Sequence, residues 1–182
     1  MNYQWYPGHM TKARRMMQEN IKLIDLVIEL VDARIPISSR NPDIDELGKG
    51  KSRIILLNKS DLADPVWNKK WVEYFAAKGM GVLEINSRTG MGIKSIQGLV
   101  QEVCKEKIER DRKRGIVNRP VRAMVVGIPN VGKSTFINAM LGKKILPAKK
   151  RATTAIISKI IYSDKPKYYL HYKNNKKQIS ND

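Results

Sequence analysis

The chain has 182 residues, of which 42% are hydrophobic, and this length and composition fit one globular domain with a buried core. Cys104 is the one cysteine, so an intramolecular disulfide is excluded and a reducing compartment is expected. The first residues contain no apolar signal-peptide core, and no uncharged apolar stretch reaches the ~18 residues of a membrane span, so we expect a cytoplasmic protein outside the membrane.

The formal net charge is +18, and the positive charge is concentrated in two stretches. Residues 105–122 contain eight Lys or Arg against three acids, and residues 143–182 contain eleven against two. Such clusters predict attraction to a polyanion, for which RNA is the cytoplasmic candidate; the alternative is a solvated surface without a partner.

Helical and strand patterns alternate along the chain. In order, they predict a helix over 11–24, a strand over 26–31, a Pro/Ser/Asn-rich loop through 36–42, a strand over 53–57, a helix over 66–78, a strand over 82–85, a helix over 93–112, a strand over 121–126 and a helix over 133–141. We expect the aromatic side chains of the 66–78 helix to lie in the core, the alternative being a platform for stacked bases. The alternation predicts an α/β domain whose largely parallel sheet binds its ligand beyond the carboxyl ends of the strands.

The segment Gly127-Ile128-Pro129-Asn130-Val131-Gly132-Lys133-Ser134 fits the phosphate-binding loop G-x-x-x-x-G-K-[ST], and it lies between a predicted strand and a predicted helix. Glycine allows the sharp turn that points backbone N–H groups at phosphate oxygens. Lys133 would bridge the β- and γ-phosphates and Ser134 would ligate Mg²⁺. The alternative is a glycine-rich turn that binds nothing. The predicted nucleotide contacts of this loop are Asn130, Val131, Gly132, Lys133, Ser134 and Thr135.

The segment Asn58-Lys59-Ser60-Asp61 has the form N-K-x-D and follows the predicted 53–57 strand. The Asp61 carboxylate can accept hydrogen bonds from the N1–H and the amine of guanine, which adenine does not offer. Asn58 would face the base O6 or brace the loops, and the stem of Lys59 would cover the base plane. Asn86, Ser87 and Arg88 follow the next strand, where a short loop could close on guanine or form an ordinary turn.

The order of these motifs is unusual, because the guanine segment precedes the phosphate loop. Together with Trp5-Tyr6-Pro7-Gly8-His9-Met10 and the segment Asp32-Ala33-Arg34-Ile35-Pro36-Ile37-Ser38-Ser39-Arg40-Asn41-Pro42, this order resembles the circularly permuted GTPases of the YlqF/RbgA type. The resemblance covers roughly residues 2–150. It implies a three-layer P-loop GTPase domain with the motif order G4-G5-G1, binding of GTP/GDP and Mg²⁺, and partners in the large ribosomal subunit, its precursor and its rRNA.

The resemblance also implies a role for His9. In this family the histidine of the Pro-Gly-His-Met segment is thought to replace the glutamine that orients the attacking water in Ras-like enzymes. A neutral imidazole can position water near the γ-phosphate. The alternative is a cap or docking contact at a Pro-Gly turn.

The C-terminal segment departs from the family pattern. The resemblance implies a switch threonine, for which Thr153 and Thr154 are candidates, and then two paired strands, for which 156–162 and 168–172 are candidates. The D-x-P-G segment expected next is replaced by Lys173-Asn174-Asn175-Lys176. Asp164 is either a metal-side carboxylate or a turn residue.

These features predict a permuted GTPase domain over 1–162 and a basic tail over 163–182, whose charge and low apolar content after 170 favour disorder. The RNA-binding helical domain of the family is expected to be absent, as in a shortened or altered member. The sequence therefore predicts a GTPase that acts in assembly of the large ribosomal subunit. The alternatives are a guanine-nucleotide- and RNA-binding module with little or no hydrolysis, and an ATP-dependent P-loop enzyme, which Asp61 disfavours.

Overall fold

A computed structural model describes the backbone of residues 8–117, 119–144, 146, 158–161, 168–172 and 175–179. The side chains it describes are those of 14, 15, 17–117, 119–144 and 146. A five-stranded sheet in the order β3-β2-β1-β4-β5 forms the centre of the domain. Its strands are β1 (Leu26–Asp32), β2 (Ser52–Asn58), β3 (Gly81–Ile85), β4 (Arg122–Val126) and β5 (Ser158–Ile161).

The strands β1 to β4 are parallel, whereas β5 pairs with β4 antiparallel. All seven residues of β1 are buried, because this strand lies between β2 and β4 and both of its faces are covered. The helices are α1 (Gly8–Ile21), α2 (Asp43–Leu47), α3 (Pro65–Ala76), α4 (Ile96–Val103), α5 (Lys105–Lys113) and α6 (Lys133–Leu141), with the short 3₁₀ helices η1 (Ser60–Leu62) and η2 (Ile93–Ser95).

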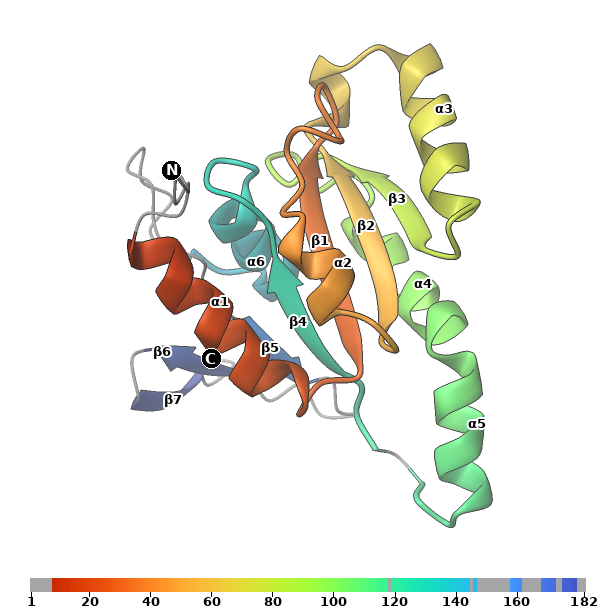
Figure 1. Cartoon of the computed structure of the whole chain (residues 1–182), viewed down its shortest axis with the longest axis vertical. Coiled ribbons are helices and arrows are strands. Elements are labelled where there is room, and N and C mark those ends of the chain that lie inside the picture. The colour runs from red at the N-terminus through yellow and green to blue at the C-terminus, as the bar shows by residue number, and fades with distance from the viewer. Residues whose placement is uncertain are drawn as a thin grey trace, which may run out of the picture.

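Helices cover both faces of the sheet, which gives three layers (Figure 1). On one face, Met17 of α1 and Ile44 of α2 pack against Val27 and Met124. Phe75 of α3 joins a neighbouring cluster on Val31, which shares the face of Val27 because side chains alternate along a strand. On the other face, side chains of α4 and α6 pack against β1 and β4; these include Ile96, Phe136, Ile137, Ile28 and Val125. The predicted three-layer, mostly parallel α/β fold is confirmed.

Residues 36–42 form the expected loop, and the short helix α2, which was not predicted, follows it. Two predicted helices were wrong in detail. The predicted helix over 93–112 is divided at Cys104, where the backbone has φ −98° and ψ 7°. Just before this break, the carbonyl of Val103 accepts a hydrogen bond from the hydroxyl of Ser52, which ties α4 to the start of β2. Helix α1 ends at Ile21 instead of residue 24, and the chain then turns into β1.

The aromatic stripe of α3 is only partly in the core. Phe75 is fully buried and Trp71 packs against its cluster, but Trp67 is 56% exposed and Tyr74 is 40% exposed. The prediction failed for these two rings because α3 lies beside the sheet and presents one narrow face to it (Figure 1). Lysine side chains cover the exposed rings instead, with an ammonium nitrogen 4.3 Å from the centre of the Trp67 ring and another 4.2 Å from that of Tyr74.

The C-terminal strands pair differently from the prediction. The expected strands over 156–162 and 168–172 correspond to β5 and β6 (Tyr168–Tyr172). They do not pair with each other in a sheet: β5 joins β4, and β6 forms a two-stranded sheet with β7 (Asn175–Ile179). Within the described chain, no helix is long and apolar enough to cross a membrane.

Candidate nucleotide-binding site

The predicted motifs meet at the carboxyl edge of the parallel sheet. Asp32 ends β1 and Asn58 ends β2, while Asn86 directly follows β3 and Gly127 directly follows β4. The chain proceeds from β1 outward to β2 and β3, and then returns to the opposite side of β1 with β4. Such a change of direction is where open α/β sheets bind their ligands.

The phosphate loop makes a tight turn between β4 and α6. Asn130 has φ 68° and Gly132 has φ 99°, a backbone region that side chains rarely adopt. A Cβ atom on Gly132 would also collide with the side-chain amide of Asn58, so glycine is required for both conformation and space. Helix α6 starts at Lys133 without a side-chain cap, so N–H groups of its first turn are available to an anion.

Lys133 is buried inside this loop, with 7% of its surface exposed. Its ammonium donates hydrogen bonds of 2.6 Å to the carbonyl oxygens of Gly127 and Ile128. Among the described side chains, no carboxylate forms an ion pair with it, and burial lowers the pKa of Lys133 to about 8. A buried cation with neutral acceptors gains from a nearby anion, so this loop fits the phosphate groups of a nucleotide.

Asn58 connects three segments. Its amide nitrogen donates to the carbonyl of Val131 at 2.7 Å, and its amide oxygen accepts from both the backbone and the hydroxyl of Ser87, at 3.0 and 2.9 Å. Asn58 is only 2% exposed. Of the two roles considered for this side chain, the geometry matches the bracing of the loops.

Lys59 crosses from the guanine segment to the phosphate loop. Its backbone has φ 61°, and its ammonium donates to the carbonyl of Asn130 at 2.9 Å and to the carboxylate of Asp32 at 2.7 Å. These contacts hold the stem of Lys59 between the two motifs. Such a position allows the stem to cover one face of a base bound beside it.

Asp61 lies in η1 and is exposed to solvent. The preceding residue, Ser60, fixes this turn. The hydroxyl of Ser60 donates to the carbonyl of Ile85, and the backbone carbonyl of Ser60 accepts from the side-chain amide of Asn68. Asp61 is therefore presented on an anchored turn beyond the ends of β2 and β3. An exposed carboxylate on a fixed support is suited to bind the hydrogen-bond donors of guanine.

The third loop is organised by Asn86. Its side-chain oxygen accepts from the backbone N–H groups of Arg88 and Thr89, at 2.9 and 3.2 Å. Ser87 is buried against Asn58, whereas Arg88 is exposed. The loop is thus an Asx turn locked to the guanine segment, with Arg88 free of the core.

The other predicted site residues are not brought together by the described structure. Ser134 and Thr135 lie partly exposed in the first turn of α6, next to Lys133. His9 lies in the first turn of α1, but its side chain is outside those described. Thr153, Thr154 and Asp164 lie outside the described residues.

Asp32 is a site residue whose contacts sequence reasoning missed. Its carboxylate accepts from Lys59 and from the guanidinium and backbone N–H of Arg34, with the closest contacts at 2.7 Å. The Arg34 guanidinium and the Lys59 ammonium hold the pKa of Asp32 well below its ordinary value, despite the opposing effect of burial. The available signal was the position of Asp32 at the end of a buried strand, next to the guanine-segment strand.

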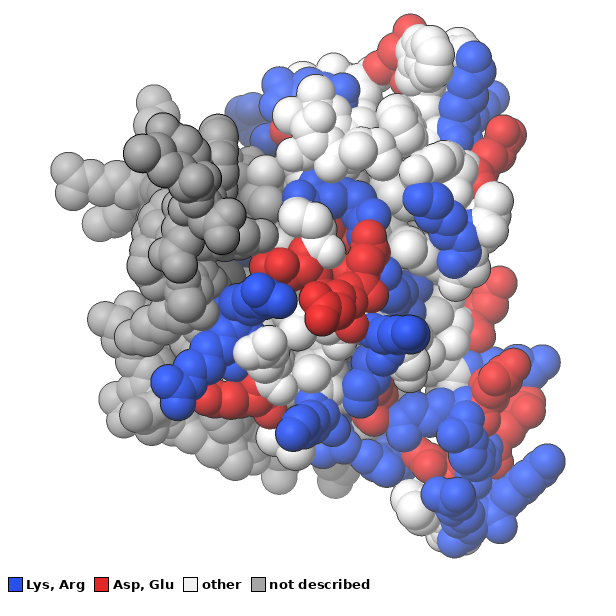
Figure 2. Space-filling model, in the orientation of Figure 1, with Lys and Arg blue, Asp and Glu red and all other residues white. Residues whose placement is uncertain are grey.

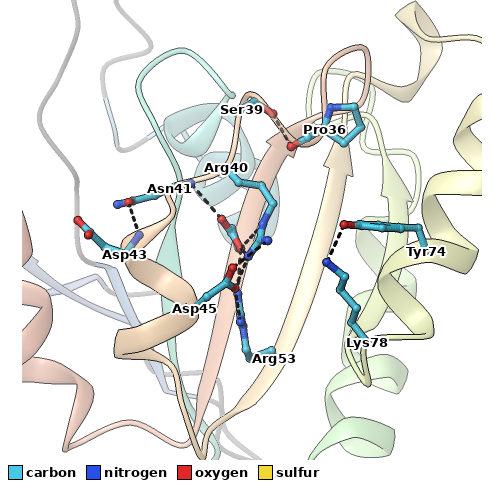
Figure 3. A network of polar contacts seen from close by, with 10 residues as sticks. Pro36, Ser39, Arg40, Asn41, Asp43, Asp45, Arg53, Tyr74 and Lys78 are labelled. Atoms are coloured by element: carbon cyan, nitrogen blue, oxygen red, sulfur yellow. Dashed lines mark hydrogen bonds and ion pairs between the residues drawn. The ribbon is translucent and has the colours of Figure 1, made fainter. Parts of the chain in front are cut away.

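The loop after Asp32 is held by a partly buried ion network (Figure 3). The guanidinium of Arg40 binds Glu29 at 3.0 Å and Asp45 at 2.6 Å, and Arg53 binds the same two carboxylates at 3.2 and 2.6 Å. Glu29 is 1% exposed, and the two guanidiniums compensate its charge in the core. Ser39 closes the loop by accepting from the backbone N–H of Asp32 and donating to the carbonyl of Pro36.

Comparisons with known proteins agree with this geometry. The model of the dynamin family matches residues 123–181. "Ribosome biogenesis GTPase A" of Priestia megaterium is 53% identical over 146 residues, which are 80% of this chain and 51% of that protein. "Mitochondrial ribosome-associated GTPase 1" of Xenopus tropicalis is 33% identical over 177 residues, covering 91% of this chain and 55% of that protein. The chain spans about half the length of the curated relatives it matches.

A solved structure shows the same likeness. The GNP-bound YlqF from T. maritima is 31% identical and superposes with a TM-score of 0.57, over 82% of this chain and 56% of that one. The motif order, the sheet and the relatives thus agree with the resemblance seen in the sequence. Over the part that it shares with these relatives, the chain belongs to the circularly permuted GTPases of the YlqF/RbgA type.

Proposed function

We propose that this chain binds GTP and GDP with Mg²⁺ and acts as a GTPase in assembly of the large ribosomal subunit. The observation that carries the proposal is the bridge at Asn58, whose side chain holds the guanine segment, the phosphate loop and the 86–90 loop in one arrangement. A base and a phosphate chain could be held at once only if these loops keep a fixed separation. The proposal is further supported by the relatives, whose names place them in ribosome biogenesis or on the mitochondrial ribosome.

The nucleotide would be held by groups already positioned at the carboxyl edge. The Asp61 carboxylate would bind the guanine donors, the Lys59 stem would cover the base, and the loop from Asn130 to Thr135 would surround the phosphates. Lys133 would exchange its contacts with the Gly127 and Ile128 carbonyls for contacts with phosphate oxygens. Arg88, exposed beside the buried Ser87, would border the base.

The hydroxyl of Ser134 fits Mg²⁺, because it is a partly exposed oxygen donor next to the lysine of the loop, and Mg²⁺ prefers oxygen ligands. When bound, Mg²⁺ would neutralise negative charge on the phosphate oxygens. Thr153 and Thr154 are proposed as switch residues near the γ-phosphate. His9, which lies in the first turn of α1, is proposed to orient the attacking water.

The charge supports ribosomal partners. A net charge of +18 favours binding to rRNA within the large subunit or its precursor, and such a role implies the cytoplasm. The second candidate function is a module that binds guanine nucleotide and RNA with little hydrolysis. It is favoured by the sequence Lys173-Asn174-Asn175-Lys176 at the place of D-x-P-G.

The proposal is tested by titrating fluorescent GDP, GTP and ATP analogues and by measuring GTP turnover with and without large ribosomal subunits. Guanine preference with stimulated turnover supports the GTPase, and guanine preference without stimulation selects the binding module. Equal affinity for ATP would contradict the role of Asp61. If turnover is stimulated, a His9→Ala variant should lose the stimulation while it retains GDP binding; unchanged turnover would contradict the role of His9.

A further inference from the structure

A basic cleft lies at the opposite end of the sheet from the nucleotide site. It has a volume of about 290 Å³ and is formed where the chain enters β2 and β3. Lys49, Lys51 and Arg53 line it on the side of the first turn and Lys78 on the side of the second, while Asp45 of α2 is the one acidic residue in the lining that the structure describes. Gly48, Gly50 and Gly79 also line the cleft. Because glycine has no side chain, the backbone of both turns is accessible there.

The acidic residue of the cleft is already neutralised. Asp45 is bound at 2.6 Å by both Arg40 and Arg53, and these arginines also bind the buried Glu29 (Figure 3). Two carboxylates are thus matched by two guanidiniums. The three lysines of the cleft remain as its uncompensated charges.

The lysines have only neutral partners among the described residues. Lys51 donates to the carbonyl of Ile24 at 2.9 Å, and Lys78 donates to the hydroxyl of Tyr74 at 2.6 Å. Lys49 is exposed, and no described carboxylate forms an ion pair with any of the three. Three positive charges that line one open cleft repel one another, so an anion bound among them would be stabilised.

We propose that this cleft binds the phosphate backbone of RNA. Lysine is a point charge on a flexible stem, which suits contacts with phosphates that carry no sequence information. Lys and Arg side chains are also numerous on α5, where they alternate with Asp and Glu at the lower right of the molecule (Figure 2). A lipid surface fits less well, because Met80 and Val103 are the only large apolar side chains among the described residues that line the cleft.

The position of the cleft lets RNA and nucleotide bind at the same time. Ser52 at the cleft and Asn58 at the nucleotide site are the first and last residues of the seven-residue strand β2, roughly 20 Å apart along the strand. RNA in the cleft would therefore not cover the phosphate loop. The choice of RNA as the partner rests on the proposed function in ribosome assembly, whereas the site itself rests on the charges described above.

The test compares two variants that each lose two charges. Lys49→Gln combined with Lys78→Gln removes two lysines of the cleft, and Lys69→Gln combined with Lys94→Gln removes two exposed lysines that do not line it. The probe is a fluorescein-labelled RNA duplex of about 16 base pairs, titrated at several salt concentrations. A labelled polyglutamate peptide is titrated in parallel. Thermal unfolding and binding of a fluorescent GDP analogue verify that both variants are folded.

The cleft variant should bind the duplex about tenfold more weakly at low salt, and its slope of log affinity against log salt should be shallower by roughly 1 to 2. The control variant should keep an affinity within about twofold of the unmodified chain. Unchanged RNA affinity in the cleft variant, or an equal loss in both variants, overturns the proposal. If the cleft variant loses polyglutamate binding but keeps its RNA affinity, the partner is an acidic protein, and the proposal is likewise overturned. A chain that binds RNA through the cleft but does not bind the GDP analogue would contradict the proposed function and leave the cleft standing.

Discussion

The side-chain amide of Asn58 donates a 2.7 Å hydrogen bond to the carbonyl of Val131, a residue 73 positions later in the chain. The same side chain accepts two hydrogen bonds from Ser87. One buried amide therefore determines the spacing of the three loops at the carboxyl edge of the sheet. Loss of this side chain should affect stability and nucleotide binding together.

An Asn58→Ala variant tests this relationship. The carbonyl of Val131 and both donors of Ser87 would lose their partners in a buried site, so the free energy of unfolding should fall by about 2 to 4 kcal/mol. Affinity for a fluorescent GDP analogue should fall at least tenfold. Urea unfolding and a GDP titration measure the two effects. Asn41→Ala is the matched control, because Asn41 makes a local bond to the backbone of Asp43, and its loss should cost about 1 kcal/mol. Equal effects of the two substitutions would contradict the bridging role.

A Lys133→Met variant should show the cost of burying an ammonium. The ordinary pKa is 10.5, and burial lowers it to about 8. Below pH 8 the lysine is charged in both the folded and the unfolded chain, and its burial destabilises the fold. Between pH 8 and 10.5 the unfolded chain binds more protons, so stability contributed by Lys133 rises with pH.

The unmodified chain should therefore gain stability relative to the Lys133→Met variant as the pH rises. The difference in the free energy of unfolding, variant minus unmodified chain, should decrease by up to about 3 kcal/mol between pH 7 and pH 10. Urea unfolding of both proteins at the two pH values measures this change. Nucleotide binding by the variant should be abolished at either pH. A difference that stays constant with pH would show that Lys133 titrates normally.

An Asp32→Asn variant should reveal the anchoring of Lys59. Because the pKa of Asp32 is lowered in the folded chain, its ionised form contributes stability above the ordinary value of 3.8. This contribution, about 2 kcal/mol for charged hydrogen bonds, is lost as the pH falls below that value. The unmodified chain should thus be more stable than the variant at pH 6. The difference between their free energies of unfolding should be smaller at pH 3. Arg34→Gln, which leaves Lys59 paired with Asp32, should retain more GDP affinity than the Asp32 variant.

A Gly132→Ala variant separates steric collision from backbone strain. Alanine at Gly132 must adopt φ 99° and also collides with the Asn58 amide. Alanine at Gly50 must adopt φ 77° but has no neighbouring atom within 4 Å of its Cβ. Gly50→Ala should cost about 1 kcal/mol of stability, and Gly132→Ala about 2 kcal/mol more, with loss of GDP binding. If thermal unfolding shows similar stability losses for the two variants, backbone strain alone accounts for the effect of Gly132→Ala.

The sequence predicts the elements whose signal is local. Helix α6 begins and ends where predicted, at Lys133 and Leu141, because the phosphate-loop motif determines its start. The four parallel strands are largely apolar stretches, so they were also found to within one residue at either end. Signals of this kind need no knowledge of the rest of the chain.

The features that the sequence did not predict depend on contacts across the fold. Helix α2 has five residues and is bound through Asp45 to Arg40 and Arg53, the latter eight positions downstream. Asp32 reaches Lys59 because the sheet register pairs Asp32 with Asn58. The exposure of Trp67 follows from the position of α3 beside the sheet. None of these can be read from a pattern of neighbouring residues.

The placement of β4 beside β1 has a consequence for the order of events during synthesis. The strands β1, β2 and β3 come in succession and can assemble as soon as they leave the ribosome, but β1 must wait about 90 residues for its second neighbour. At a translation rate of roughly 5–20 residues per second, this wait is about 5–20 s, during which a strand that is fully apolar except for Glu29 and Asp32 has an open edge. The nascent chain thus displays its guanine-recognition loops before the phosphate loop exists. Nucleotide capture can therefore only follow synthesis of β4 and the phosphate loop, whereas the open edge of β1 is closed when β4 pairs with it.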